Sequence, residues 1–267
     1  MKKFLLATVL GAFCLSAQGQ MGSLSFSLGL PQNDFKENTD ATGFGGDLSL
    51  AFPFQKGVPV YLGLDINYMV YGSNSRNLDL FADITVPDGS GGTILIDRLD
   101  IPLRVVNTNS LFGTHAFVRA VAPLELIQPY GEVLFGFRYI STNTKIIDRS
   151  EERRWAKDPD DSDLISRKTV LDDWILSYGF GGGFLIKVGP SFFIDLRANF
   201  MKGQRAQYFD GDDTAAWDVT ISDIGNITDP DDPAIDDIDG DNLAVGARPR
   251  ESTTDLLVIK FGVAFKI

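Results

Sequence analysis

Hydrophobic and polar residues alternate along eight stretches of this chain. In the first, from Gly22 to Leu30, Leu or Phe occupies every second position, and Ser or Gly fills the positions between. A repeat of two residues is typical of a β-strand whose two faces meet different surroundings. The same repeat predicts seven more strands, at residues 44–52, 60–70, 110–122, 129–142, 174–188, 191–208 and 255–267.

The predicted connections alternate between short and long. Three are short, at residues 53–59, 123–128 and 189–190, and four are long, at residues 31–43, 72–109, 143–173 and 209–254. An even number of strands with short turns on one side and long loops on the other is typical of an up-and-down antiparallel barrel in an outer membrane. The fold class predicted is therefore all-β: an eight-stranded transmembrane β-barrel with short periplasmic turns and long extracellular loops.

The register of one hairpin follows from its turn. A four-residue turn from Leu124 to Ile127 pairs residues whose numbers sum to 251. Arg119 then lies opposite Glu132, and Gly113 lies opposite Arg138, so the polar residues of both strands fall on the same face of the hairpin.

The composition of the two faces predicts which one is enclosed. The polar face carries charges of both signs among many small residues, whereas the other face is almost purely Leu, Ile, Val, Phe and Tyr. Mixed charges suit a narrow lumen, and an apolar face suits lipid. The predicted lumen charge network consists of Asp47, Asp65, His115, Arg119, Glu132, Arg138, Asp195 and Arg197. Aromatic residues near the strand ends (Tyr68, Tyr139, Trp174, Tyr178 and Phe265) are predicted to form interface girdles.

The N-terminus has the layout of a cleavable export signal. Lys2 and Lys3 precede an apolar run from Phe4 to Leu15, and small residues follow at positions 17 and 19. We expect cleavage after Gly19, which divides the chain into a signal peptide (1–19) and a barrel domain (20–267).

Composition excludes several kinds of site. The single cysteine, Cys14, excludes a disulfide scaffold, and the single histidine, His115, excludes a site built on two imidazoles. No basic patch with interleaved aromatics suggests a nucleic-acid partner.

Three segments resemble those of a known family. The apolar final strand Leu256–Ile267, the stretch from Gln128 to Phe137 and the segment Lys202–Tyr208 resemble small bacterial outer-membrane β-barrels of the porin superfamily, of the type common in Bacteroidetes. The resemblance implies an outer-membrane location in a Gram-negative bacterium, with outer-membrane lipid and the insertion machinery as partners. Ile267 departs from the family pattern, in which the last residue is usually aromatic.

The segment 209–254 is strongly acidic. Between residues 209 and 251 it carries twelve Asp and Glu251 against Arg248 and Arg250, a net charge of −11 out of −12 for the whole chain. Asp236, Asp237, Asp239 and Asp241 are candidate calcium ligands because hard cations bind several carboxylate oxygens on a Gly-bent loop. The EF-hand spacing is not matched, and a solvated acidic loop without any cofactor is the simpler expectation.

Candidate chemistry is sparse, and four functions stay open. The first is a non-enzymatic structural or surface-interaction barrel with a plugged lumen, and the second is a narrow pore for small solutes. The third is a soluble lipocalin-like binder, and the fourth is a lipid hydrolase using His115 with Ser110, Ser141 or Glu132. We expect the first and predict no catalytic residue.

Overall fold

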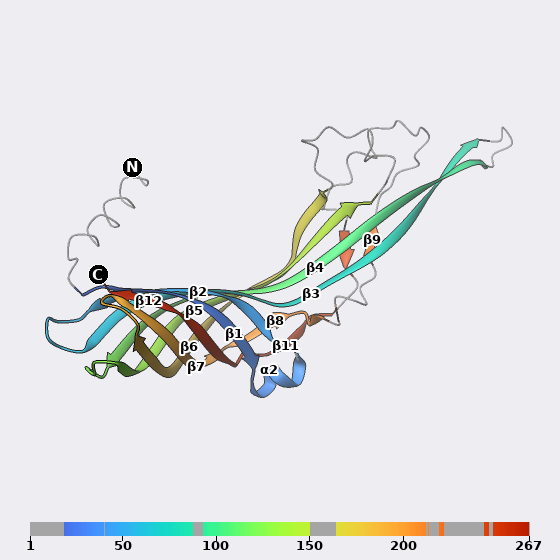
Figure 1. Cartoon of the computed structure of the whole chain (residues 1–267). Coiled ribbons are helices and arrows are strands. Elements are labelled where there is room, and N and C mark those ends of the chain that lie inside the picture. Colours follow the sequence, from blue (N-terminus) through green and yellow to red (C-terminus); the bar gives the residue numbers. More distant parts are fainter. Residues whose placement is uncertain are drawn as a thin grey trace, which may run out of the picture.

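The computed structural model describes residues 19–39, 41–87, 93–149, 164–211, 213, 219–221, 243–245 and 248–266. Eight strands of this part of the chain close into one antiparallel barrel in the order β1-β12-β7-β6-β5-β4-β3-β2 (Figure 1). The strands are β1 (Met21–Pro31), β2 (Gly43–Pro53), β3 (Val60–Pro87), β4 (Thr93–Val121), β5 (Ile127–Asp148), β6 (Leu164–Lys187), β7 (Phe192–Gly203) and β12 (Leu256–Lys266). The predicted eight-stranded fold is confirmed.

Smaller elements lie on the side of the long connections. A short helix, α2 (Asn33–Asn38), follows β1, and β8 (Arg205–Tyr208) pairs with β11 (Arg250–Thr253). β9 (Val219–Ile221) and β10 (Leu243–Val245) form a second small antiparallel pair. In the described residues, no helix combines the length and apolar character needed to cross a membrane. The predicted signal peptide lies almost wholly outside the described residues.

The hairpin register predicted from the Leu124–Ile127 turn is the one observed. Arg119 pairs with Glu132, and Gly113 pairs with Arg138, across β4 and β5. The inward face of that hairpin is therefore set by its turn length, because a shift of one residue would exchange the two faces.

Two predicted loops are largely strand. The pairing of β3 with β4 continues from the barrel out to Pro87 and Thr93, and the pairing of β5 with β6 continues to Ile147 and Leu164. Figure 1 shows these strands running far beyond the barrel wall. The sequence pattern missed them because the segment after Gly72 reads Ser-Asn-Ser-Arg-Asn, with polar residues on both faces of the sheet. These five residues carry no alternation, although Leu103, Val105 and Ile146 of the neighbouring extensions are buried.

The seventh predicted strand is also broken. β7 leaves the barrel at Gly203, and Arg205 to Tyr208 turn away as β8 to pair with β11. A Cβ atom at Gly203 would lie 1.9 Å from Thr254 Oγ1, so the close approach of these two segments of the chain requires glycine at this bend.

Candidate functional site

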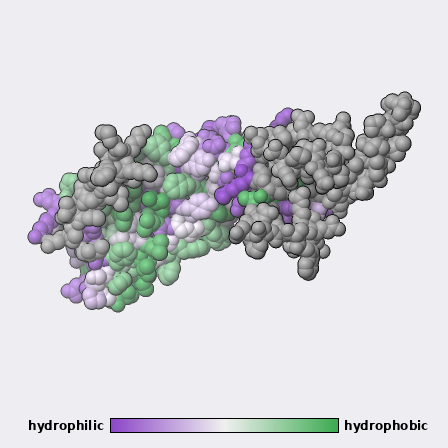
Figure 2. Space-filling model, turned by 90° about the horizontal axis from the view of Figure 1, so that it is seen from above, coloured by the Kyte–Doolittle hydropathy of each residue, from purple (hydrophilic) through white to green (hydrophobic). Residues whose placement is uncertain are grey.

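The outer surface of the barrel is apolar, and its interior is polar. Phe135, Phe180 and Phe261 are 60%, 63% and 60% exposed, whereas Arg119 and Asp195 are each 1% exposed. Figure 2 shows the hydrophobic residues gathered over the barrel body. A soluble barrel has the reverse distribution, so the exterior is suited to hydrocarbon rather than water.

An aromatic row crosses four adjacent strands of this exterior. Tyr68 pairs with Phe112, Phe112 with Tyr139, and Tyr139 with Trp174, so the four rings follow one another from β3 to β6. The Tyr139 and Trp174 rings lie 4.9 Å apart between centroids. These four residues, called the aromatic row below, lie where the barrel wall gives way to the long extensions of β3–β6. Amphipathic rings of this kind concentrate at membrane–water boundaries.

All eight residues singled out as lumen charges are buried inside the barrel. Seven of them carry formal charge, and six of those seven share one network of ion pairs. Arg197 lies at its centre: its Nη2 is 2.7 Å from Asp195 Oδ2, and its Nη1 is 3.0 Å from Asp65 Oδ2. Its Nε donates to the hydroxyl of Tyr130 at 3.0 Å, and that hydroxyl donates to Asp195 at 2.6 Å. The arginine thereby ties three strands together across the lumen.

Arg119 forms a second arm of the network. Its Nη2 is 2.7 Å from Glu132 Oε2, and Glu132 Oε1 accepts a hydrogen bond from Asn199 Nδ2 at 2.8 Å. The guanidinium carbon lies 4.7 Å from the Phe117 ring centroid and 4.5 Å from that of Tyr130. Two aromatic rings thus contact the cation in place of water.

Lys260 completes the network. Its Nζ is 2.6 Å from Asp47 Oδ2 and 2.9 Å from Asp65 Oδ1. Lys260 was not predicted as a site residue, although its place in the alternation of the final strand puts it on the polar face. Tyr130 and Asn199 also contribute to the network and were not predicted, because a neutral side chain in a strand carries no charge signal.

Glycines on β6 make room for this network. A Cβ atom at Gly181 would lie 2.1 Å from Asn199 Oδ1 and 2.3 Å from the backbone oxygen of Ala198. A Cβ atom at Gly183 would lie 2.7 Å from the Tyr130 hydroxyl. The Gly181–Gly183 run therefore has a packing role in the lumen wall and lies within a strand, unlike a phosphate-binding loop.

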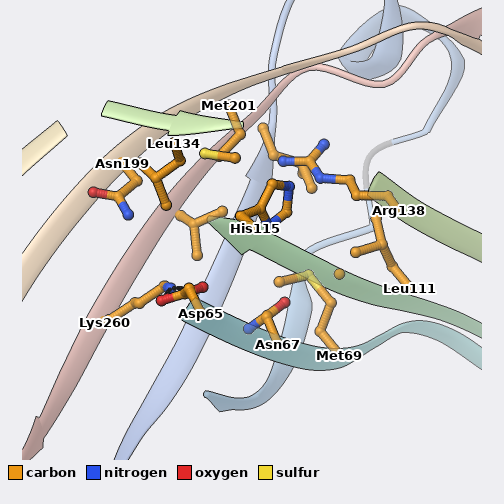
Figure 3. Close-up of a pocket in the computed structure, with 13 residues that line it drawn as sticks. Asp65, Asn67, Met69, Leu111, His115, Leu134, Arg138, Asn199, Met201 and Lys260 are labelled. Atoms are coloured by element: carbon orange, nitrogen blue, oxygen red, sulfur yellow. Dashed lines mark hydrogen bonds and ion pairs between the residues drawn. The ribbon is translucent and has the colours of Figure 1, made fainter. Parts of the chain in front are cut away.

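Arg138 and His115 take no part in these ion pairs, and they line a small cavity together with Asp65 and Lys260 (Figure 3). Arg138 Nη1 donates to the backbone oxygen of Thr254 at 2.8 Å, and no carboxylate of the described chain lies within ion-pair distance of it. Within the described residues, His115 Nε2 has no hydrogen-bond partner. The cavity volume is about 20 Å³, which is room for about one water molecule.

Buried apolar residues lie on both sides of the lumen charges. Near the short turns, buried residues from several strands form a floor: Met21, Ala51, Phe117, Val121, Leu185, Phe193 and Ala264. On the opposite side, Phe35 of α2 packs edge-on against Tyr208, with 5.0 Å between ring centroids, and against Tyr71 at 6.2 Å. These three rings, called the aromatic cap below, lie over the mouth of the barrel.

Polar contacts hold the aromatic cap in place. Thr39 Oγ1 donates to Asp210 Oδ1 at 2.5 Å, and Asn109 Nδ2 donates to the backbone oxygen of Phe209 at 3.0 Å. Arg250 Nε lies 2.6 Å from Asp213 Oδ2, and its Nη1 contacts the Asn38 carbonyl. Burial raises the pKa of Tyr208, whose hydroxyl is 2.6 Å from Ser252 Oγ.

The residues named for a hydrolase do not come together. Ser110 Oγ is 3.1 Å from Ser141 Oγ, so the two serines pair with each other, and Glu132 is bound to Arg119 and Asn199. Among the described residues, no hydrogen bond joins His115 to a serine. No nucleophile–base pair of the kind that a hydrolase needs is assembled there.

The described residues contain no cluster of three or more His, Cys, Asp or Glu side chains that could hold a metal ion. Asp236, Asp237, Asp239 and Asp241, the candidate calcium ligands, lie outside the described residues.

No protein-family model and no curated protein sequence matches this chain. Among solved structures, the chain is similar to the attachment invasion locus protein Ail of Yersinia pestis, with 11% identity over 94% of this chain and 99% of that one and a TM-score of 0.38. It is similar to Neisserial surface protein A, with 10% identity over 93% and 96% and a TM-score of 0.36. It is also similar to a major outer membrane protein of Thermus thermophilus, with 12% identity over 92% and 99% and a TM-score of 0.41.

Proposed function

We propose that this protein is an outer-membrane β-barrel with a closed lumen, which acts as a membrane-embedded scaffold for the structures on its long-loop side. One observation carries the proposal: the barrel exterior is apolar, while its interior holds a network of buried ion pairs. A lone charge on a lipid-facing strand costs about 2–4 kcal/mol at the bilayer midplane. The enclosed charges avoid that cost, and the closed sheet has no unpaired edge exposed to lipid.

The strand lengths support a membrane location. β1, β2 and β12 have 11 residues each, and β7 has 12. A tilted transmembrane strand needs about 9–11 residues to cross the hydrocarbon. The shorter side of the barrel is therefore about as tall as a bilayer core, and only β3–β6 reach well beyond it.

The layers inside the lumen support closure. A solute crossing the barrel would have to pass the aromatic cap, the ion-pair network and the apolar floor in turn. The cavity beside His115 and Arg138 has room for about one water molecule. We therefore favour a structural and surface-interaction role over a narrow pore, and a non-enzymatic one, since no catalytic constellation is assembled in the described residues.

Targeting follows from the sequence and is part of the proposal. The N-terminal segment serves as an export signal, and the apolar final strand serves as the signal for the insertion machinery. The Bacteroidetes-type affiliation stays a prediction from sequence resemblance.

Membrane fractionation and gel migration test the proposal directly. The full chain should fractionate with outer membranes, require detergent for extraction, and migrate differently on a denaturing gel before and after boiling. In planar bilayers it should show no conductance steps. A chain found soluble without detergent would refute the membrane location, and steady single-channel conductance would refute the closed lumen while leaving the barrel intact.

A further inference from the structure

The outward face of β4–β6 changes character beyond the aromatic row. On these strands most outward positions after the row are polar, although Val106 and Ile147 are apolar. Three of the outward residues are basic: Arg104 on β4, Lys145 on β5 and Arg167 on β6. These three residues are called the basic band below. Arg104 and Arg167 are exposed, and Lys145 is half-buried.

The strand register brings the basic band together. Lys145 lies directly opposite Arg167, and Arg104 lies opposite Ile147, which places it diagonally from Lys145. Side chains directly opposite on one face of an antiparallel pair are about 5 Å apart at Cβ, and diagonal neighbours are about 7–8 Å apart. Lys145 thus neighbours both Arg167 and Arg104, which lie two strands apart from each other, on a chain whose net charge is −12.

Among the described residues, no carboxylate forms an ion pair with a cation of the basic band. Arg104 Nη2 donates only to Ser75 Oγ, at 3.3 Å, and neither Lys145 nor Arg167 has an ion pair with the described residues. Like charges directly opposite each other destabilise a sheet. Lys145 and Arg167, with Arg104 diagonally beside Lys145, therefore form a site that an external anion would stabilise.

Two described carboxylates face outward beside the basic band. Asp79 on β3 lies opposite Pro102 and therefore diagonally from Arg104, the same register relation that Arg104 has to Lys145. Asp172 lies opposite Ser141, on the side of the aromatic row. Arg149 follows directly after the end of β5 and adds a fourth cation. Among the described residues, the positive charge is therefore concentrated around Lys145 and Arg167.

The height of the basic band above the aromatic row points to a particular kind of anion. Lys145 is six residues beyond Tyr139, about 20 Å along a strand. At a strand tilt of about 40°, this is about 15 Å above the row. An ordinary phospholipid headgroup adds only about 5–8 Å to each side of the hydrocarbon. A larger saccharide headgroup that carries phosphate reaches the basic band more readily.

We propose that the basic band binds phosphate groups borne on the saccharide headgroup of an outer-leaflet glycolipid. The proposal rests on the membrane location proposed above. The aromatic row holds the barrel at the hydrocarbon boundary, and Arg104, Lys145 and Arg167 reach outward into the layer of sugar phosphates. Arginine suits this role because its planar guanidinium donates two parallel hydrogen bonds to a phosphate.

The test uses the full chain in nanodiscs that contain a core-bearing, phosphorylated lipopolysaccharide or its enzymatically dephosphorylated form. The measurement is the amount of glycolipid retained per barrel after detergent extraction and purification, at low and at high salt. The test variant is Arg104→Gln, Lys145→Gln and Arg167→Gln combined. The control removes three exposed cations near the short turns: Lys56→Gln, Lys187→Gln and Lys266→Gln.

Each cation should contribute a factor of about five to the affinity for the glycolipid. The test variant, which lacks three, should therefore bind the phosphorylated glycolipid about a hundredfold more weakly than the parent. The control should match the parent, the dephosphorylated glycolipid should bind poorly, and high salt should weaken the parent's retention. Equal retention by the parent and the test variant, or an equal loss in the control, overturns the proposal. Competition by inorganic phosphate in the absence of any membrane overturns the assignment to a lipid.

The gel migration of each variant separates this proposal from the previous one. A parent that never enters the bilayer refutes the membrane location itself. A parent and a test variant that both enter it, shift on boiling and retain glycolipid equally refute only the basic band.

Discussion

Replacing Arg197 with methionine should destabilise the barrel more than any other single change in the lumen. The parent network contains four carboxylates (Asp47, Asp65, Asp195, Glu132) and three cations (Arg119, Arg197, Lys260). Arg197→Met removes the cation that contacts two of these carboxylates at 3.0 Å or less. Loss of one partner from a buried ion pair costs about 3–5 kcal/mol because it leaves an uncompensated charge.

A second substitution distinguishes charge from packing. Asp195→Asn removes the carboxylate nearest to Arg197, so the double variant has the same difference between acids and bases as the parent. If charge compensation dominates, the double variant should be more stable than Arg197→Met alone, by about 1–3 kcal/mol of coupling between the two sites.

The assay is denaturant unfolding in lipid vesicles, followed by tryptophan fluorescence and checked by gel migration. If Arg197→Met lowers the free energy of unfolding by less than about 1 kcal/mol, water already screens these charges. Conductance across planar bilayers should be recorded for the parent and for Arg197→Met. If Arg197→Met loses less than about 1 kcal/mol of stability and the parent conducts, the lumen is not closed.

The other predictions concern the wall, the exterior and the cap. Gly181→Ala should destabilise the barrel by about 1–3 kcal/mol because its Cβ meets backbone atoms, whereas Gly131→Ala, whose nearest atom is 3.9 Å away, should be well tolerated in the same assay. Phe135→Arg should lower the unfolding free energy of the barrel in vesicles by about 2–4 kcal/mol. Phe54→Arg, in a turn, should lower it by about 0–1 kcal/mol, and equal losses would contradict a lipid-facing exterior. Burial raises the pKa of Tyr208, so its contribution to the cap is present below pH 10 and is lost as the pH rises above it. The protection of the amides of residues 205–208 against hydrogen exchange, relative to the intrinsic exchange rate at each pH, should fall above that pH in the parent and not in Tyr208→Phe.

The sequence by itself determined the strands, the turn register and the enclosed face. Alternation over 11 residues tells which face of a strand is apolar, and a four-residue turn sets how two neighbouring strands align. Both signals are local, so the pairing of Arg119 with Glu132 could be predicted from the length of the turn between them alone. The mixture of charge and small residues on the polar face was enough to predict that it points inward.

Only the tertiary structure decided which lumen residues meet. Lys260 and Asp47 are far apart in the chain, and their 2.6 Å contact depends on strand stagger accumulated around the whole barrel. The same geometry separates Arg138 from the ion pairs, although the sequence grouped it with them. The long extensions of β3–β6 and the bend at Gly203 also escaped the pattern, because alternation reports a boundary between apolar and polar surroundings. Where both faces of a strand are polar, or where a contact comes from a distant segment, that signal is absent.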